Sequence, residues 1–171
     1  MTMQVLVAYA TKSGSTGEIA AAIGATLRGA GLDVDVRNAR EVQTLAPYGA
    51  VVLGSALYSA HWQRDANRFV KRHLAELQRR PIWLFSSGPL DHSAEFADIP
   101  LTAHVAPEMA PIGARGHRTF GGRLLEGTPG VDASMLATHR VGDFRNWAHI
   151  EAWAREIAAA LTETNGGPSN G

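Results

Sequence analysis

A turn rich in hydroxyl and glycine residues lies near the start of the chain and has the composition of an anion site. It comprises Thr11, Lys12, Ser13, Gly14, Ser15 and Thr16. Its hydroxyls are hydrogen-bond donors, and Gly14 permits the tight backbone path that points N–H groups inward. The turn matches neither G-x-x-x-x-G-K-[ST] nor G-x-G-x-x-G, which argues against nucleotide hydrolysis and against a dinucleotide. It suits one terminal phosphate monoester, and a simple capped helix start is the alternative interpretation.

The elements on either side of this turn provide the geometry that an anion site requires. Residues 4–9 are an apolar run that predicts a buried central strand. A helical pattern follows over residues 16–30, with Ile19, Ile23 and Leu27 on one stripe. The first N–H groups of a helix lack an internal partner and the helix dipole is positive there, so an anion is favoured at this position.

Strand and helix patterns alternate along the rest of the chain. Further strands are expected at residues 32–37, 50–54, 81–86 and 117–122, and further helices at residues 63–79, 101–112 and 147–162. This alternation predicts an α/β fold with an open, doubly wound parallel sheet. Such sheets bind ligands at the carboxyl ends of their strands, so the loops after Tyr9, Gly54, Ser86 and Gly122 should converge.

The domain organisation follows from length and composition. One domain is expected over residues 1–163, because 171 residues suffice for a single full core. Residues 164–171 consist mainly of Gly, Asn, Ser and Pro, and they are expected to form a disordered tail.

The first turn also resembles that of a known family. Thr11 to Thr16 fits the [ST]-x-[ST]-G-x-T phosphate loop of flavodoxins, and the resemblance extends from Met3 to about Leu161. Residues 54–62 and 142–147 are similar to flavodoxin-domain proteins related to the quinone-linked protoporphyrinogen IX dehydrogenase. The resemblance implies a flavodoxin-like five-stranded parallel sheet of order 2-1-3-4-5, with FMN as the cofactor and its phosphate in the first turn.

A second loop concentrates aromatic residues at the same expected edge. It comprises Leu57, Tyr58, Ser59, Ala60, His61 and Trp62. With a flavin bound there, Tyr58 and Trp62 could form a wall for the ring; alternatively, Trp62 packs the next helix on the core. His61 is either a donor near the ring or a polar loop residue. Flavodoxins commonly have a glycine here, beside the flavin N5, where the peptide can flip when the flavin is reduced. The β-carbons of Ser59 and Ala60 disfavour the positive φ of such a conformation. We therefore expect a poorly stabilised semiquinone, which favours two-electron transfer.

Two more turns complete the predicted cofactor site. They comprise Ser86, Ser87, Gly88, Pro89 and Leu90, together with Gly121 and Gly122. Their backbone donors and acceptors could hydrogen-bond the uracil-like edge of a flavin, and Leu90 could cover a face of the ring. Alternatively, they are an ordinary strand-exit turn and a strand end. The segment 142–147 is interpreted as structural, with Asp143 or Asn146 capping the last helix.

Composition excludes several classes of function. The net charge is zero, which gives no indication of nucleic-acid binding. The absence of cysteine rules out disulfides, thiolate catalysis and thiolate-held iron–sulfur clusters. The histidines lack metal-ligand spacing, so no metal is expected. No apolar run reaches the roughly 20 residues that span a bilayer, and a cytoplasmic location without a transmembrane segment is expected.

These observations favour an FMN-binding redox protein whose cofactor carries the chemistry, so no catalytic residue is assigned. The expected function is an oxidoreductase that resembles the protoporphyrinogen dehydrogenase group and passes electrons between an organic donor and a quinone or similar acceptor. A flavodoxin-type carrier that serves a redox partner, a variant using deazaflavin and a cofactor-free descendant are the alternatives. Residues 124–140 lack a clear basic amphipathic face, so docking to a membrane is not expected.

Overall fold

The computed structural model describes residues 3–165, which form an α/β structure built on one parallel sheet. Its parallel strands are β1 (Gln4–Ala10), β2 (Asp33–Asn38), β3 (Ala50–Tyr58), β5 (Ile82–Ser87) and β6 (Gly116–Phe120). Their spatial order is β2-β1-β3-β5-β6, and every neighbouring pair is parallel. The short β4 (His61–Trp62) pairs only with β3. Counted along the parallel strands, the order is therefore 2-1-3-4-5, which confirms the predicted doubly wound sheet.

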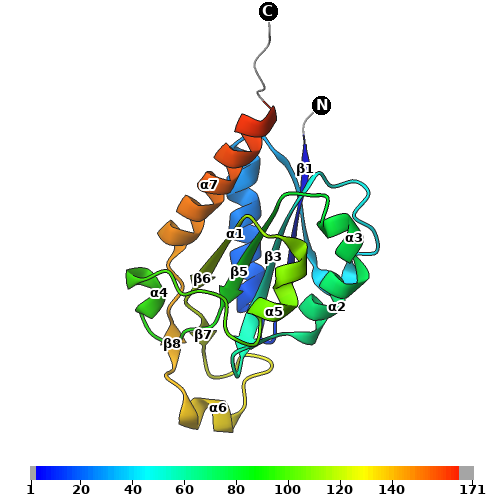
Figure 1. The fold of residues 1–171 in the computed structure, drawn as a ribbon. Coiled ribbons are helices and arrows are strands. Elements are labelled where there is room, and N and C mark those ends of the chain that lie inside the picture. Colours follow the sequence, from blue (N-terminus) through cyan, green and yellow to red (C-terminus); the bar gives the residue numbers. More distant parts are fainter. Residues whose placement is uncertain (1–2, 166–171) are drawn as a thin grey trace, which may run out of the picture.

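Helices cover both faces of this sheet (Figure 1). On one face lie α1 (Ser15–Gly29) and α7 (Trp147–Asn165), which contact each other. The other face carries α2 (Arg64–Arg72), α3 (Leu74–Leu77) and α5 (Ala106–Met109). The remaining short elements are α4 (Ser93–Phe96), α6 (Ala133–Thr138), β7 (Arg123–Leu124), β8 (Gly142–Asp143) and the 3-10 turns Ala39–Glu41 and Ala110–Ile112.

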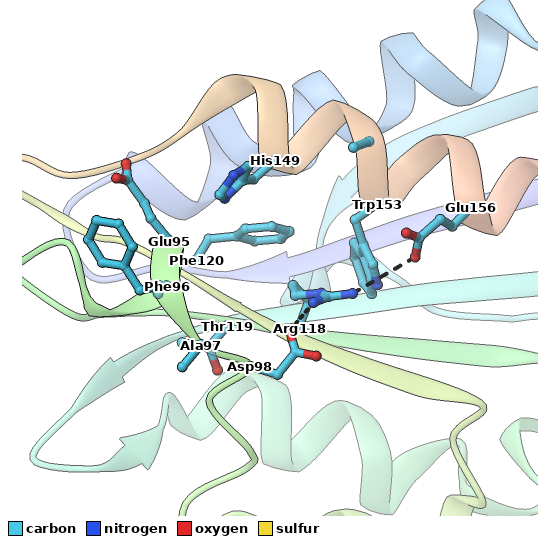
Figure 2. Close-up of a pocket in the computed structure, with 12 residues that line it drawn as sticks. Glu95, Phe96, Ala97, Asp98, Arg118, Thr119, Phe120, His149, Trp153 and Glu156 are labelled. Carbon is cyan, nitrogen blue, oxygen red and sulfur yellow. Dashed lines mark hydrogen bonds and ion pairs between the residues drawn. The ribbon is translucent and has the colours of Figure 1, made fainter.

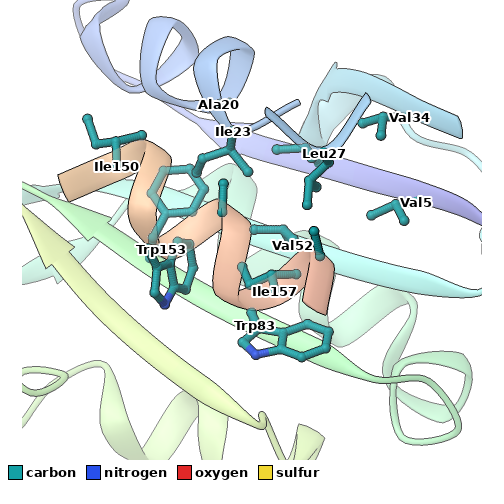
Figure 3. Packing of buried hydrophobic residues seen from close by; sticks show 14 of the residues in the cluster. Val5, Ala20, Ile23, Leu27, Val34, Val52, Trp83, Ile150, Trp153 and Ile157 are labelled. Carbon is teal, nitrogen blue, oxygen red and sulfur yellow. The ribbon is translucent and has the colours of Figure 1, made fainter. Parts of the chain in front are cut away.

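Alternation along the central strands creates a core on each face. In β1, Val5 and Val7 belong to the cluster under α1 and α7, whereas Leu6 and Ala8 belong to the cluster under α2. Figure 3 shows the first cluster, in which side chains of the two helices meet those of the strands. Burial on both faces explains why β1 reads as a continuous apolar run.

Gly54 leaves space that the ring of Phe85 fills. The two residues are partners across β3 and β5. A β-carbon on Gly54 would lie 2.0 Å from the Phe85 ring, which is fully buried and lies 6.2 Å from the ring of Trp153, centroid to centroid. The strand that leads to the second predicted loop is thus fixed to its neighbour by an aromatic side chain.

A buried polar network joins three strands near the carboxyl edge. The Trp62 indole N–H donates to Ser86 Oγ at 3.0 Å, and His117 Nε2 lies 3.0 Å from the same oxygen. Burial lowers the pKa of His117 to about 4. His117 is therefore neutral at pH 7, and the network ties β4, β5 and β6 together without a buried charge.

Two of the expected helices are interrupted. The helix expected over residues 63–79 breaks at His73, whose φ of −110° and ψ of 19° separate α2 from α3. The helix expected over residues 101–112 is confined to α5 and the following 3-10 turn. Pro107 and Pro111 explain this, because proline lacks an N–H and is tolerated only in a first helical turn.

The strand and helix ends also differ from expectation. The strand expected to end at Gly54 continues to Tyr58, because its last residues pair with β4. The last helix extends through Asn165, so Thr164 and Asn165 are helical although they were assigned to the tail. Residues 166–171, the rest of the expected tail, lie outside the described residues.

The network around His117 makes stability depend on pH. Between pH 6.5 and about 4 the unfolded chain binds a proton that the folded chain excludes. The free energy of unfolding should therefore fall by up to about 3 kcal/mol as the pH drops through this window. His117→Gln should remove most of this dependence in urea unfolding at several pH values. The matched control is His149→Gln, at an exposed site. An unchanged pH dependence in His117→Gln would contradict the assignment.

Candidate functional site

The first predicted turn connects β1 to α1 and leaves hydrogen-bonding groups without partners. Gly14 adopts a left-handed φ of 94°, and its N–H donates to Thr11 Oγ1 at 2.9 Å. Thr16 is fully buried, and its Oγ1 has no hydrogen-bond partner among the described residues. The first N–H groups of α1 also lack partners within the helix. A buried hydroxyl beside free N–H donors is costly unless a ligand pairs with it.

The remaining residues of this turn differ in exposure. Ser15 is buried, Ser13 is half-buried and Lys12 is exposed. The Lys12 ammonium lies over the ring of Tyr58, 3.5 Å from its centroid. The structure thus brings the first and second predicted loops together through a cation–π contact, and the one cation of the turn lies beside the aromatic loop.

The second predicted loop forms a hairpin with a strained turn. Leu57 pairs with Trp62 and Tyr58 pairs with His61, so Ser59 and Ala60 are the turn residues. Their φ angles are 49° and 64°. Such turns usually contain Asn-Gly, and a non-glycine residue in this region costs about 1–2 kcal/mol.

The two aromatic residues of this hairpin differ in exposure. Tyr58 is 50% exposed, whereas Trp62 is 4% exposed and donates its N–H to Ser86. Tyr58 therefore presents an accessible ring at the sheet edge. Trp62 packs into the core, which matches the alternative interpretation of that residue.

The third and fourth turns lie against each other and against the hairpin. The Gly122 N–H donates to the Pro89 carbonyl at 2.8 Å, and the Gly88 N–H donates to the Phe120 carbonyl at 3.2 Å. A β-carbon on Gly88 would lie 2.9 Å from that of Leu57. The carboxyl ends of β3, β5 and β6 thus converge as the fold class predicts.

The other residues predicted in these turns have varied surroundings. Ser86 belongs to the Trp62 network, and Ser87 is buried. Leu90 is half-buried. A β-carbon on Gly121 would lie 2.0 Å from the Phe144 carbonyl oxygen, so this glycine allows the segment before α7 to approach the edge strand.

The segment between β6 and α7 returns to the first turn. A β-carbon on Gly130 would lie 2.8 Å from the Lys12 carbonyl oxygen. At the end of this segment the Arg145 guanidinium is 4% exposed. It donates to Glu18 at 2.8 Å, to Asp143 at 2.7 Å and to the Ser15 carbonyl at 3.3 Å.

This ion cluster braces the start of α1. Hydrogen bonds from Arg145 lower the pKa of Glu18 and of Asp143, and Asp143 in turn raises the pKa of Arg145. Arg123 adds a second cation 3.3 Å from Glu18. Through Arg145 the segment 142–147 therefore makes structural contacts with the helix that follows the first predicted turn.

A cavity of about 390 Å³ lies elsewhere, between α4, β6 and α7 (Figure 2). Its lining contains none of the predicted site residues. Arg118 pairs there with Asp98 and with Glu156, and Phe120 and Trp153 are buried beside it. The predicted residues instead gather at the open carboxyl edge of the sheet. Within residues 3–165 no cluster of three or more His, Cys, Asp or Glu side chains could hold a metal ion.

Sequence similarity to known proteins covers much of the chain. The family model described as "Flavodoxin domain" matches residues 6–126. Protoporphyrinogen IX dehydrogenase [quinone] from Escherichia coli K12 is 29% identical over 86 residues, which are 49% of this chain and 48% of that protein. The matched segment spans about half the length of the curated relatives.

Several solved structures share the fold. Rubredoxin oxygen:oxidoreductase from Desulfovibrio gigas superposes with a TM-score of 0.66 at 14% identity, covering 96% of this chain and 37% of that one. A flavodoxin from the domain Archaea has a TM-score of 0.61 at 16% identity, and the match covers 94% of this chain and 99% of that one. The flavodoxin of Streptococcus pneumoniae TIGR4 has a TM-score of 0.59 at 18% identity, and the match covers 92% of this chain and 99% of that one. At these identities the likeness concerns the fold. Because the family model covers most of the chain, this protein belongs to the flavodoxin domain family.

Proposed function

We propose that this protein binds FMN and is a flavin-dependent oxidoreductase. The observation that carries the proposal is the buried Thr16 hydroxyl without a partner at the start of α1. A phosphate oxygen would pair with this hydroxyl and with the free N–H groups of the first helical turn. The residues present thus fit a phosphate monoester, which FMN carries and riboflavin lacks.

The proposed site has a phosphate part and a ring part. Ser13, Ser15 and Thr16 would hold the phosphate, and Lys12 belongs to the same turn, with its ammonium over the Tyr58 ring. The hairpin with the exposed Tyr58 and the turn 87–90 would hold the ring between them. FMN supplies reversible electron transfer when bound, and the role of these residues is to bind and orient it.

The reaction class we propose is electron transfer from a reduced organic donor to a quinone or similar acceptor. The 29% identity to a quinone-linked dehydrogenase supports it. A flavodoxin-type carrier is the second candidate, but the zero net charge removes the simplest means of steering a basic redox partner. Within the described part of the chain, no helix is long and apolar enough to cross a membrane.

Two measurements test this proposal directly. An absorption spectrum of protein purified without added cofactor should show flavin bands, and extraction should release FMN. A deazaflavin in the extract would support that variant instead. Oxidation of protoporphyrinogen with a soluble quinone then tests the enzyme class. Reduction of the bound flavin by a partner protein alone would support the carrier.

Thr16→Val is expected to change FMN affinity and stability in opposite directions. FMN affinity should fall about 10- to 100-fold, because a charge-assisted hydrogen bond is lost. Riboflavin affinity should stay the same. The apo-protein should gain about 1 kcal/mol of stability, because a buried hydroxyl without a partner is replaced by a methyl group.

Fluorescence titration and urea unfolding measure these changes. Thr26→Val, later on the same helix and only part-buried, serves as the matched control and should leave both ligands unaffected. If wild-type protein binds FMN and riboflavin with equal affinity, the phosphate assignment is wrong.

Arg145→Met is expected to destabilise the protein by about 2 kcal/mol and to weaken FMN binding. The substitution leaves Glu18 and Asp143 without their main partner, and both carboxylates remain partly exposed, which limits the cost. Arg155→Met removes only an exposed pair with Glu151, so it should change stability by less than about 0.5 kcal/mol. Equal effects of the two substitutions would show that the cluster does not brace α1.

A further inference from the structure

The turn of the β3–β4 hairpin requires support from outside the hairpin. Ser59 and Ala60 both carry a β-carbon and both adopt positive φ. Residues in such strained conformations persist when the surrounding structure holds them there. The hairpin itself offers little support, because β4 has only two residues.

The support comes from a segment far along the chain. Thr102 Oγ1 donates to the Ala60 carbonyl at 2.6 Å, across a sequence separation of 42 residues. The ring of His104 stacks on the ring of His61 with 4.0 Å between centroids and 25° between planes. Both contacts meet the hairpin at its turn or directly beside it.

Thr102 is itself well anchored. The N–H groups of Val105 and Ala106 donate to its carbonyl, and the Val105 N–H also lies 3.2 Å from its hydroxyl oxygen. Val105 is buried in the core under α2. The Thr102 hydroxyl therefore links the turn to a fixed part of the molecule.

Holding the turn also sets the position of the exposed aromatic ring. Tyr58 is the cross-strand partner of His61, one residue before the strained pair. The Lys12 ammonium lies over one face of the Tyr58 ring. If the turn relaxed to negative φ, the backbone on both sides would rotate and Tyr58 would move with it.

We propose that Thr102 is a positioning residue that holds the strained turn, and with it Tyr58, in the conformation that receives the flavin ring. This inference rests on the proposed FMN site. It assigns Thr102 to the ring part of that site and not to the phosphate part. Loss of the hydroxyl should therefore weaken the binding of FMN and the binding of riboflavin by the same factor.

Titration of five variants with FMN and with riboflavin tests the inference, among them Ala60→Gly alone and combined with Thr102→Val. Thr102→Val should weaken the binding of both flavins about tenfold. Thr102→Ser should bind them like wild type because it keeps the hydroxyl. Ala60→Gly removes the strain at that position. In the Ala60→Gly background, Thr102→Val should therefore lower the affinity for either flavin by less than about threefold. Thr162→Val removes a comparable hydroxyl-to-carbonyl hydrogen bond within α7 and should leave both affinities unchanged.

Hydrogen exchange of the apo-protein provides a readout that needs no flavin. In Thr102→Val the amides of residues 59–62 should exchange at least tenfold faster, while those of β1 and β5 keep the wild-type rate. Unchanged exchange in the hairpin would overturn the inference, as would a loss of FMN affinity without a matching loss for riboflavin. If wild-type protein binds neither flavin, the proposed function fails, while the exchange experiment still decides whether Thr102 holds the turn.

Discussion

The parallel alignment of five strands is the constraint on which the rest of this structure depends. Parallel strands place all their carboxyl ends at one edge, and each crossover returns the chain over one face of the sheet, with the 3-10 turn Ala39–Glu41 in place of an α-helix between β2 and β3. The turn after β1, the hairpin after β3 and the turns after β5 and β6 therefore meet without any direct sequence relationship. A site assembled in this way can change its loops while the sheet stays the same.

Holding these loops in place falls to side chains from remote segments. Arg145 reaches Glu18 across 127 residues, and Ser86 lies between Trp62 and His117. The Thr102 hydroxyl meets the hairpin turn across 42 residues. Each contact uses a hydrogen bond or an ion pair, which gives direction as well as stability, although those to Glu18 and to the hairpin turn lie at an exposed surface. The loops that gather at the edge are thus individually braced, and none depends on its local sequence alone.

The parts that could be predicted from the sequence are those with local signals. The apolar run of β1 and the glycine and hydroxyl residues after it lie next to each other in the chain, so their pattern predicts the strand, the turn and the helix start. The hairpin lacked such a signal, because Ser59 and Ala60 are not typical residues of a two-residue turn. The opposite exposures of Tyr58 and Trp62 could not be deduced, since two aromatic residues in one loop look alike without the register of β3 and β4. Arg145 and Thr102 act over long separations, where spacing carries no information.

The fit of Phe85 into the space above Gly54 has a consequence for how such sequences diverge. A side chain at position 54 and a six-membered ring at position 85 exclude each other, because the two would occupy the same volume. A side chain at position 54 therefore requires a smaller residue at position 85, so related chains should change position 54 only together with position 85. Covariation between these two positions would then reflect steric exclusion in the sheet and carry no information about the flavin.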